Sequence, residues 1–287
     1  MDWQKLQYGL GGLLRRGYQK RCCPSCGSQA SQRVDRKVFH DLRRCVDCEL
    51  LYRWPYETPA EMASFYQRGY QQAGLTTDVP DAATLNSLMA AGFRGSAKDF
   101  SRVIELLEVL SVPRGARILD FGANWGYGVW QFRQAGFSAI GYELSRPRAG
   151  YSKNLGVEVF TDWSEIEDRG TFDVVFSSHV LEHTPDPAEA LRRKLGVVSP
   201  GGWLIAFFPS GSEVFQKSDP AAFHRRWGQV HPVVLNEKFI RKVLPGSSLA
   251  IGAYCPEDIE GLKYWDQETA WIGTMDANEM LIVWNHA

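Results

Sequence analysis

The chain has 287 residues and a mass of 32.4 kDa, which is enough for one large domain or for a medium domain with a small one. Apolar residues make up 44% of it and aromatic residues 13%, a globular composition that excludes a chain disordered throughout. The 32 basic and 33 acidic residues almost cancel, whereas a dedicated nucleic-acid binder carries a large positive excess.

The charge is unevenly distributed along the chain. Residues 1–53 hold 11 Lys/Arg against 5 Asp/Glu, a net charge of +6, and the remainder has a net charge of −7. This pattern indicates either a basic N-terminal module on an acidic body or simple solvation of a small domain. No stretch approaches the roughly 20 apolar residues of a membrane span, and the N-terminus lacks the pattern of a secretory signal. We therefore expect a cytoplasmic protein with reduced thiols and no transmembrane segment.

Four cysteines near the N-terminus have the spacing of a zinc ribbon. Cys23 and Cys26 are followed, after 18 residues, by Cys45 and Cys48. Each pair encloses a two-residue turn that directs both sulfurs at one ion, and four thiolates leave no open position, so the predicted zinc is structural. The alternatives are disulfides, which a reducing compartment disfavours, and a redox-active pair, which would not occur twice ahead of a strand–helix core. Cys22 is an alternative ligand to Cys23, but the two-residue gap favours Cys23.

The segments before the main domain are predicted as a ribbon and a helical connection. Residues 34–39 have strand-like composition and supply one arm of the hairpin in a ribbon that spans residues 1–56. Thr58 and Glu61 then have the pattern of a capped helix start. That helix carries Phe65, Tyr66 and Tyr70, and the sequence leaves open whether the two tyrosines line the active site. Weak periodicity at residues 71–98 is typical of a mobile connection or lid, which gives a connection over 57–98.

Strands alternate with helices in the main domain, residues 99–287. Strands are expected at 117–121, 138–142, 157–160, 172–177, 202–208, 249–254 and 279–284, and helices at 100–110, 125–135, 146–155 and 187–197. This alternation predicts an α/β domain with a parallel, doubly wound sheet. Such sheets bind ligands beyond the carboxyl ends of their strands.

The turn after the first of these strands favours a ligand with positive charge. Asp120 stands at the strand end with Gly122 two positions later, but Asn124 and Tyr127 stand where a dinucleotide fingerprint needs glycines. No Gly-Lys-Ser/Thr follows, so a P-loop is excluded too. Glu143 ends the second strand, where a carboxylate can accept hydrogen bonds from both ribose hydroxyls. A nucleoside with positive charge and no phosphate is the consistent ligand, and S-adenosylmethionine fits this description.

Four segments resemble motifs of the class I S-adenosylmethionine-dependent methyltransferases. LDFGANWG (119–126) resembles motif I, YELS (142–145) the ribose-binding strand end, FDVVFSSHVLEHTPDP (172–187) the fourth-strand segment, and residues 195–208 the turn into the fifth strand. The resemblance covers roughly residues 98–287 and implies a Rossmann-like sheet. The family usually has a small residue, often glycine, where Asn124 and Trp125 stand, which leaves the contacts of this loop open.

The resemblance also implies the cofactor contacts. Asp120 and Gly122 would line the methionine part and Glu143 would hold the ribose, with a solvated strand end as the alternative for Glu143. Asp162 and Trp163 match the position that contacts adenine, with a surface aromatic as the alternative for Trp163. The complete set of expected cofactor-binding residues is Asp120, Gly122, Ala123, Asn124, Glu143, Leu144, Asp162, Trp163 and Ser178.

The N-terminal arrangement resembles a narrower group, the zinc-containing methyltransferases of sugar and polysaccharide pathways. Members of that group act on nucleotide-linked deoxysugars or glycan hydroxyls. This resemblance implies a small-molecule or glycan acceptor, with a sugar or nucleotide-sugar favoured and nucleic acid disfavoured. An RNA methyltransferase whose ribbon binds the substrate, and a non-catalytic S-adenosylmethionine-binding partner protein, are the alternatives. The acceptor atom and the oligomeric state do not follow from the sequence.

Histidines are the candidates for a general base. If the acceptor is a hydroxyl or a carbon acid, a group must take its proton, and histidine suits this role near neutral pH. His179 and His183 follow the fourth strand, and His231 lies where the family usually builds its acceptor wall. We favour His183 and His231 as the catalytic residues, with a helix cap or packing as the alternative for the first and a supporting hydrogen bond for the second. The basic residues 224–226 are either a phosphate-binding group or a solvated turn.

Overall fold

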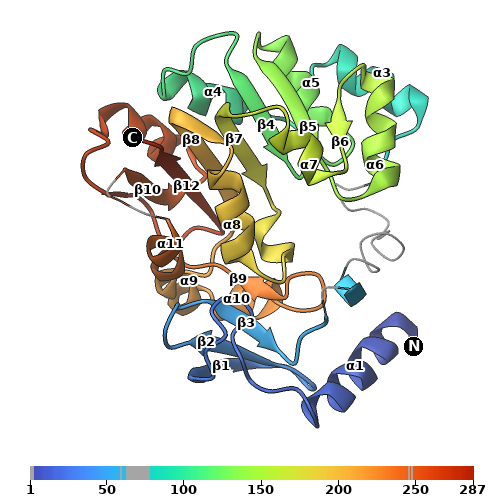
Figure 1. Cartoon of the computed structure of the whole chain (residues 1–287), viewed down its shortest axis with the longest axis vertical. Coiled ribbons are helices and arrows are strands. Elements are labelled where there is room, and N and C mark those ends of the chain that lie inside the picture. Colours follow the sequence, from blue (N-terminus) through green and yellow to red (C-terminus); the bar gives the residue numbers. More distant parts are fainter. Residues whose placement is uncertain (1–2, 59, 63–77, 245, 247) are drawn as a thin grey trace.

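The computed structural model describes residues 3–58, 60–62, 78–244, 246 and 248–287, and Figure 1 shows their arrangement. The strands are β1 (Ser31–Arg36), β2 (Asp41–Cys45), β3 (Leu51–Trp54), β4 (Arg117–Phe121), β5 (Ser138–Tyr142), β6 (Val159–Phe160), β7 (Phe172–Ser178), β8 (Val198–Pro209), β9 (Val233–Val234), β10 (Leu249–Ala253), β11 (Trp271–Ile272) and β12 (Glu279–Asn285). The helices are α1 (Trp3–Arg16), α3 (Ala82–Ala90), α4 (Ser101–Val109), α5 (Tyr127–Gln134), α6 (Arg146–Tyr151), α7 (Trp163–Glu167), α8 (Pro187–Leu195), α9 (Glu213–Ser218), α10 (Pro220–Arg226), α11 (Glu237–Val243) and α12 (Pro256–Gly261), with 3-10 turns η1 (Ser152–Leu155), η2 (Leu181–His183) and η3 (Leu262–Tyr264).

The larger of two sheets has the strand order β11-β10-β12-β8-β7-β4-β5-β6. Its neighbours run parallel except for β12, which is antiparallel to both β8 and β10. The sheet that the sequence predicted as parallel therefore has one antiparallel strand. Residues 273–278 join β11 to β12 at the carboxyl edge, and so short a connection cannot cross to the opposite edge, as a parallel strand would require. The doubly wound, Rossmann-like architecture itself is confirmed.

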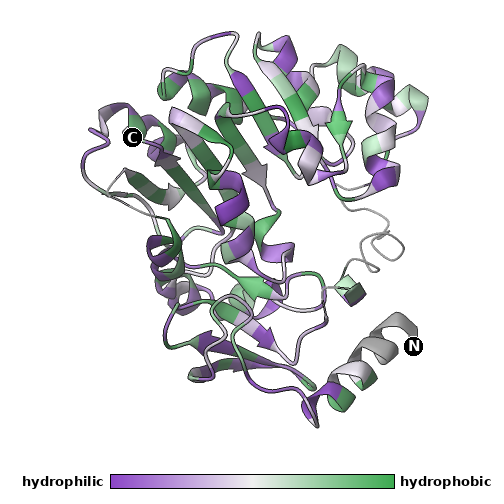
Figure 2. Cartoon of the chain, viewed as in Figure 1, coloured by the Kyte–Doolittle hydropathy of each residue, from purple (hydrophilic) through white to green (hydrophobic). Residues whose placement is uncertain are grey.

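Two apolar clusters cover the two faces of this sheet. Leu119 and Leu204 pack on one face with side chains of α8 and α11, while their strand neighbours Ile118 and Ile205 pack on the other with α4 and α5. Successive residues of a strand point to opposite faces, so burial on both sides requires continuous apolar runs. Figure 2 shows the central strands as mainly hydrophobic. The carboxyl edge of the strands therefore remains as the place for polar residues.

The N-terminal ribbon is a small antiparallel sheet of β1, β2 and β3, and β9 from the main domain extends it. The first arm lies at Ser31–Arg36 and not at the expected residues 34–39. A turn, closed by a hydrogen bond from the Lys37 N–H to the His40 carbonyl (2.8 Å), takes the last of those residues and leaves Val38 78% exposed. The two-residue strand β9 was not predicted, because β3, the strand with which it pairs, is far away in the sequence.

The connection between ribbon and main domain is described in part. The predicted capping box is confirmed, since the Thr58 N–H donates to Glu61 Oε2 (2.8 Å) and the Glu61 N–H donates to Thr58 Oγ1 (3.2 Å). Phe65, Tyr66 and Tyr70 lie outside the described residues. Within the predicted lid, α3 is a helix, and the following Phe93 is fully buried with its ring 5.9 Å from that of Trp125. This part of the connection thus packs against the motif I turn.

Candidate functional site

The turn between β4 and α5 brings backbone close to backbone at the carboxyl edge of the sheet. The Gly122 N–H donates to the Tyr142 carbonyl (2.8 Å), which ties the end of β4 to the end of β5. Gly122 has a φ of +91°, and a β-carbon there would lie 2.2 Å from Val180 Cγ2. Only glycine fits both the left-handed backbone and this contact.

Glu143 is held in place by the same turn. One carboxylate oxygen accepts a hydrogen bond from the Asn124 N–H (3.0 Å) and the other accepts one from the Ser145 N–H (2.8 Å). Asn124 adopts a φ of +52°, and its side-chain Oδ1 is buried without a partner among the described residues. The side chain at position 124, which departs from the family pattern, therefore leaves an acceptor unused at this place.

Asp120 lies beside this carboxylate and is only 3% exposed. Burial, together with the charge of Glu143, raises the pKa of Asp120 to about 8. Burial also raises the pKa of Glu143, against the hydrogen bonds that it accepts. A ligand that brings positive charge would favour the ionised forms of both groups. The pair of acids, the glycine turn and the orphaned Asn124 oxygen thus fit an adenosyl sulfonium.

The predicted adenine-binding residues lie at the start of α7. The half-buried Trp163 ring packs edge to face against Phe121 (5.5 Å) and Tyr142 (5.2 Å), so it stands over the ends of β4 and β5. Asp162 is the N-cap of α7, and its Oδ1 accepts a hydrogen bond from the Ser164 N–H (3.0 Å).

Three further predicted cofactor contacts occupy different environments. Ala123 is buried at 2% exposure, with its N–H bonded to the Tyr142 carbonyl (3.0 Å). Leu144 is 58% exposed beyond the end of β5. Ser178 is half-buried at the last position of β7, parallel to β4. All three lie at or beyond the carboxyl edge of the sheet. The backbone N–H of Ala123 is already used in a hydrogen bond within the protein.

His183 and His231 are brought together from segments 48 residues apart in the sequence. Their ring centroids are 4.7 Å apart, and one nitrogen of each ring lies within 4.8 Å of a Glu182 carboxylate oxygen. Each Nδ1 donates to a backbone carbonyl, that of Val230 for His183 (2.9 Å) and that of Arg226 for His231 (2.7 Å). Because a carbonyl only accepts, the neutral rings carry their proton on Nδ1 and their lone pair on Nε2. Burial, and then the charge of His183, lower the pKa of His231.

His179 has a different state from this pair. Its Nδ1 lies 3.2 Å from Glu182 Oε1 and its Nε2 lies 3.0 Å from Glu279 Oε1. Burial opposes the charged form, but hydrogen bonds to the two carboxylates outweigh it and raise the pKa of His179 to about 10. His179 is therefore protonated near neutral pH. Sequence reasoning missed both carboxylates, although Glu182 lies inside the quoted fourth-strand segment.

The basic residues 224–226 belong to α10 and are not a loop turn. His224 Nδ1 lies 2.8 Å from Asp35 Oδ2 of the ribbon, and Arg226 donates to Asn278 Oδ1 (2.6 Å). Two of the three side chains thus make contacts within the chain. A further cation that the sequence did not reveal is Lys194, which is fully buried with its Nζ 3.8 Å above the Phe121 ring. Burial lowers the pKa of Lys194 to about 7.

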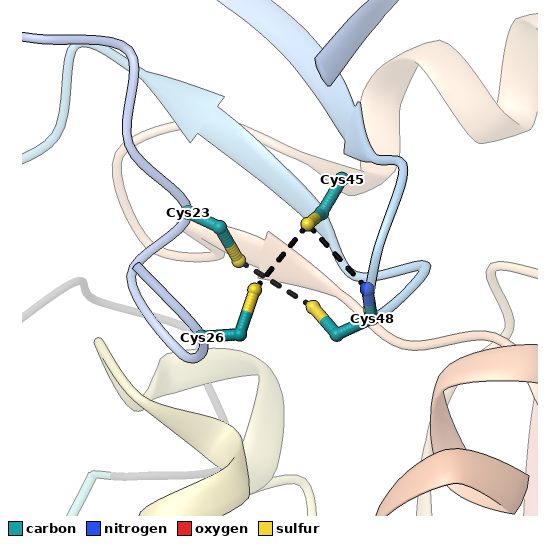
Figure 3. Close-up of side chains that lie close together, drawn as sticks. All are labelled: Cys23, Cys26, Cys45 and Cys48. Carbon is teal, nitrogen blue, oxygen red and sulfur yellow. Dashed lines mark hydrogen bonds between the residues drawn. The ribbon is translucent and has the colours of Figure 1, made fainter. Parts of the chain in front are cut away.

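The four predicted cysteine ligands converge at one end of the ribbon (Figure 3). Cys23 and Cys48 have their sulfurs 3.5 Å apart, those of Cys26 and Cys45 are 3.4 Å apart, and all four sulfurs lie within 4.8 Å of one another. Zn–S bonds of about 2.3 Å in a tetrahedron separate the sulfurs by roughly 3.8 Å, so the cluster fits zinc. Among the described residues, the group includes Cys23 and not Cys22, as the two-residue gap predicted.

Comparison with known proteins places the main domain in a family. Residues 96–238, about half of the chain, match the model of the methyltransferase domain. A ubiquinone biosynthesis O-methyltransferase of Ralstonia nicotianae is 35% identical over 100 residues, which are 32% of this chain and 42% of that protein. One of Albidiferax ferrireducens is 26% identical over 157 residues, 51% of this chain and 57% of that protein. The matches thus span about half the length of these relatives.

The fold has a counterpart among solved structures. The magnesium protoporphyrin IX methyltransferase of Synechocystis, solved with bound S-adenosylmethionine, aligns with a TM-score of 0.51 and 15% identity. The alignment covers 81% of this chain and all of that one. Within the described part of this chain, no helix is both long and apolar enough to cross a membrane.

Proposed function

The chain belongs to the class I S-adenosylmethionine-dependent methyltransferases, and we propose that it transfers a methyl group from S-adenosylmethionine to a hydroxyl of a small-molecule or glycan acceptor. The observation that carries this proposal is the pair of the buried Asp120 and the half-buried Glu143 at the carboxyl ends of adjacent parallel strands. Glu143 would hold the ribose hydroxyls and Asp120 would face the cationic methionine part. Gly122 lets the ligand lie against the backbone.

The acceptor that we propose is a sugar or nucleotide-sugar. The ribbon followed by a motif I domain, which resembles sugar-pathway methyltransferases, supports this acceptor, and the relatives named O-methyltransferases support oxygen as the methylated atom. The internal contacts of His224 and Arg226 weaken the idea that residues 224–226 bind an acceptor phosphate. We also propose that Cys23, Cys26, Cys45 and Cys48 hold a zinc ion that stabilises the ribbon and takes no part in the chemistry.

Bound S-adenosylmethionine supplies a methyl group on a sulfonium, which is a good leaving group. The protein then has to align the acceptor oxygen in line with the carbon–sulfur bond and to remove its proton. We propose that the Nε2 lone pair of His183 or His231 takes this proton, as the hydroxyl becomes a methyl ether and the sulfonium becomes a neutral sulfide. His179 cannot serve, because it already holds a proton between Glu182 and Glu279.

A panel of nucleotide-sugars, free sugars and phenols tests this function by release of S-adenosylhomocysteine. The wild type is expected to turn over at least one sugar-containing acceptor. His183→Gln and His231→Gln should each lower kcat by about 100-fold or more, while calorimetry shows unchanged binding of S-adenosylhomocysteine.

The matched control for these variants is His286→Gln, because His286 lies beyond β12 with its Nδ1 on the Val198 carbonyl (3.1 Å), at the opposite edge of the sheet. It should keep full activity. Failure of the wild type to bind S-adenosylhomocysteine would disprove the proposal, and normal kcat in both histidine variants would disprove the base.

A further inference from the structure

We propose that Arg53, a buried residue of the ribbon, is a positioning residue that holds the two histidines in their working orientation. The inference concerns residues 226–232, here called the His231 turn. It rests on the proposed function only because that function makes His183 and His231 the candidate bases. The contacts that carry it join β1, β3 and the segment after β1 to this turn, and Figure 1 shows β3 beside β9, the strand that follows the turn.

The His231 turn supplies both carbonyls that orient the imidazoles. His231 donates to the Arg226 carbonyl (2.7 Å), and His183 donates to the Val230 carbonyl (2.9 Å). The turn is closed by a hydrogen bond from the Gly228 N–H to the His231 carbonyl (3.0 Å). A shift of this turn would therefore change the tautomer and direction of both rings at once.

Arg53 holds the turn at both of its sides. Its side chain is fully buried, and Nη1 donates to the Gly228 carbonyl (2.9 Å). Its backbone N–H donates to the Pro232 carbonyl (2.8 Å), which continues the pairing of β3 with β9. An ion pair with Glu57 fixes the other end of the guanidinium. One residue of the ribbon thus binds the main chain on each side of His231.

Two further ribbon side chains hold Trp227, the residue just before Gly228. Lys37 donates to the Trp227 carbonyl, and Asp35 Oδ2 accepts a hydrogen bond from Trp227 Nε1 (2.8 Å). The Trp227 ring is buried in an apolar cluster that ribbon residues Leu42 and Leu51 share with the main domain. The ribbon and the His231 turn therefore form one packed unit, and loss of the thiol-bound metal would loosen the turn.

Histidine NMR tests the inference without a known acceptor. In full-length, zinc-replete protein labelled with 15N-histidine, the wild type should show a fixed hydrogen on Nδ1 of both His183 and His231, because each Nδ1 donates to a backbone carbonyl. Arg53→Met should convert both resonances to the averaged shifts of exchanging tautomers. Lys37→Met should shift them in the same direction by a smaller amount, and chelation of zinc should reproduce the Arg53→Met pattern.

Arg33→Met is the matched control, because Arg33 is exposed on β1, and its histidine spectrum should equal that of the wild type. S-adenosylhomocysteine should bind all variants within about twofold of the wild type, because the Asp120–Glu143 site does not touch the ribbon contacts. Wild-type histidine spectra in both Arg53→Met and Lys37→Met would overturn the inference. If Arg53→Met no longer binds the ligand, the fold is lost and Lys37→Met decides. Absence of binding by the wild type would instead contradict the proposed function.

Discussion

At the scale of single residues, the cofactor site depends on two acids whose pKa values are raised by burial. Asp120 is buried and the half-buried Glu143 lies beside it, and such a pair of acids costs folding free energy unless a ligand brings positive charge. His179 shows the reverse case, because Glu182 and Glu279 already hold its proton. In the free protein, the Asp120–Glu143 pair therefore favours binding of a cationic ligand, whereas Glu182 and Glu279 already hold a cation, the protonated His179.

Binding of S-adenosylmethionine should release a proton from Asp120. With a pKa of about 8 in the free protein, this carboxyl is mainly protonated at pH 7, and the cationic ligand favours its ionised form. Affinity should therefore rise as the pH increases from 6 to 8. Calorimetry at pH 7 in buffers of different ionisation enthalpy should show up to one proton released, and Asp120→Asn should release fewer protons than the wild type. An enthalpy that is independent of the buffer would contradict this assignment.

At the scale of elements, the strands that adjoin the site were predictable. β4 and β5 have the expected bounds because both are apolar runs, buried on both faces, that end at a glycine turn or an acidic residue. The positions of Asp120 and Glu143 follow from those strand ends, since parallel neighbours share a carboxyl edge. Strand bounds and strand-end residues, which depend on local sequence patterns, are therefore predicted well from the sequence.

Features that depend on distant partners were not predictable. The direction of β12 is set by its entry from the carboxyl edge, and β9 exists only because β3 lies beside it. Likewise, Glu279 contacts His179 although the two are 100 residues apart in the sequence, and no local sequence pattern near either residue predicts this contact. The histidine pair was chosen from loop positions, but the carbonyls that orient it became visible only in the structure.

The turn between β4 and α5 should be intolerant of a single added methyl group. Gly122→Ala combines left-handed backbone strain with a 2.2 Å approach to Val180 Cγ2, so we expect a loss of about 2–4 kcal/mol in the free energy of unfolding and no ligand binding. Gly170→Ala has similar strain at φ +76° and open space around its β-carbon, so it should lose only about 1–2 kcal/mol.

Denaturant unfolding of both glycine variants separates the clash from the strain. Adding Val180→Ala to Gly122→Ala should recover part of the lost stability, because it removes the atom that the new methyl group meets. Equal losses in Gly122→Ala and Gly170→Ala would show that the contact with Val180 relaxes without cost.

At the scale of the whole molecule, the opposite charges of ribbon and body partly neutralise each other. Arg44 pairs with Glu213 of the main domain (2.8 Å), and Arg15 and the buried Arg53 pair with Glu61 (2.5 Å) and Glu57 of the connection. These three pairs offset about half of the net charge of +6 in residues 1–53. Basic side chains that are already paired within the chain are poorly placed to bind the phosphates of a nucleic-acid backbone.

RNA binding should accordingly be weak and should depend little on salt. A protein that neutralises 6–10 phosphates loses roughly 10³–10⁵ in affinity between 50 and 200 mM salt. We expect no retention of a structured RNA at micromolar protein and 150 mM salt, and the double variant Arg33→Glu with Arg36→Glu, which reverses two exposed charges on β1, should behave like the wild type. Submicromolar binding with a steep salt slope that this double variant abolishes would make the ribbon a nucleic-acid module, and the RNA methyltransferase reading would replace the sugar acceptor.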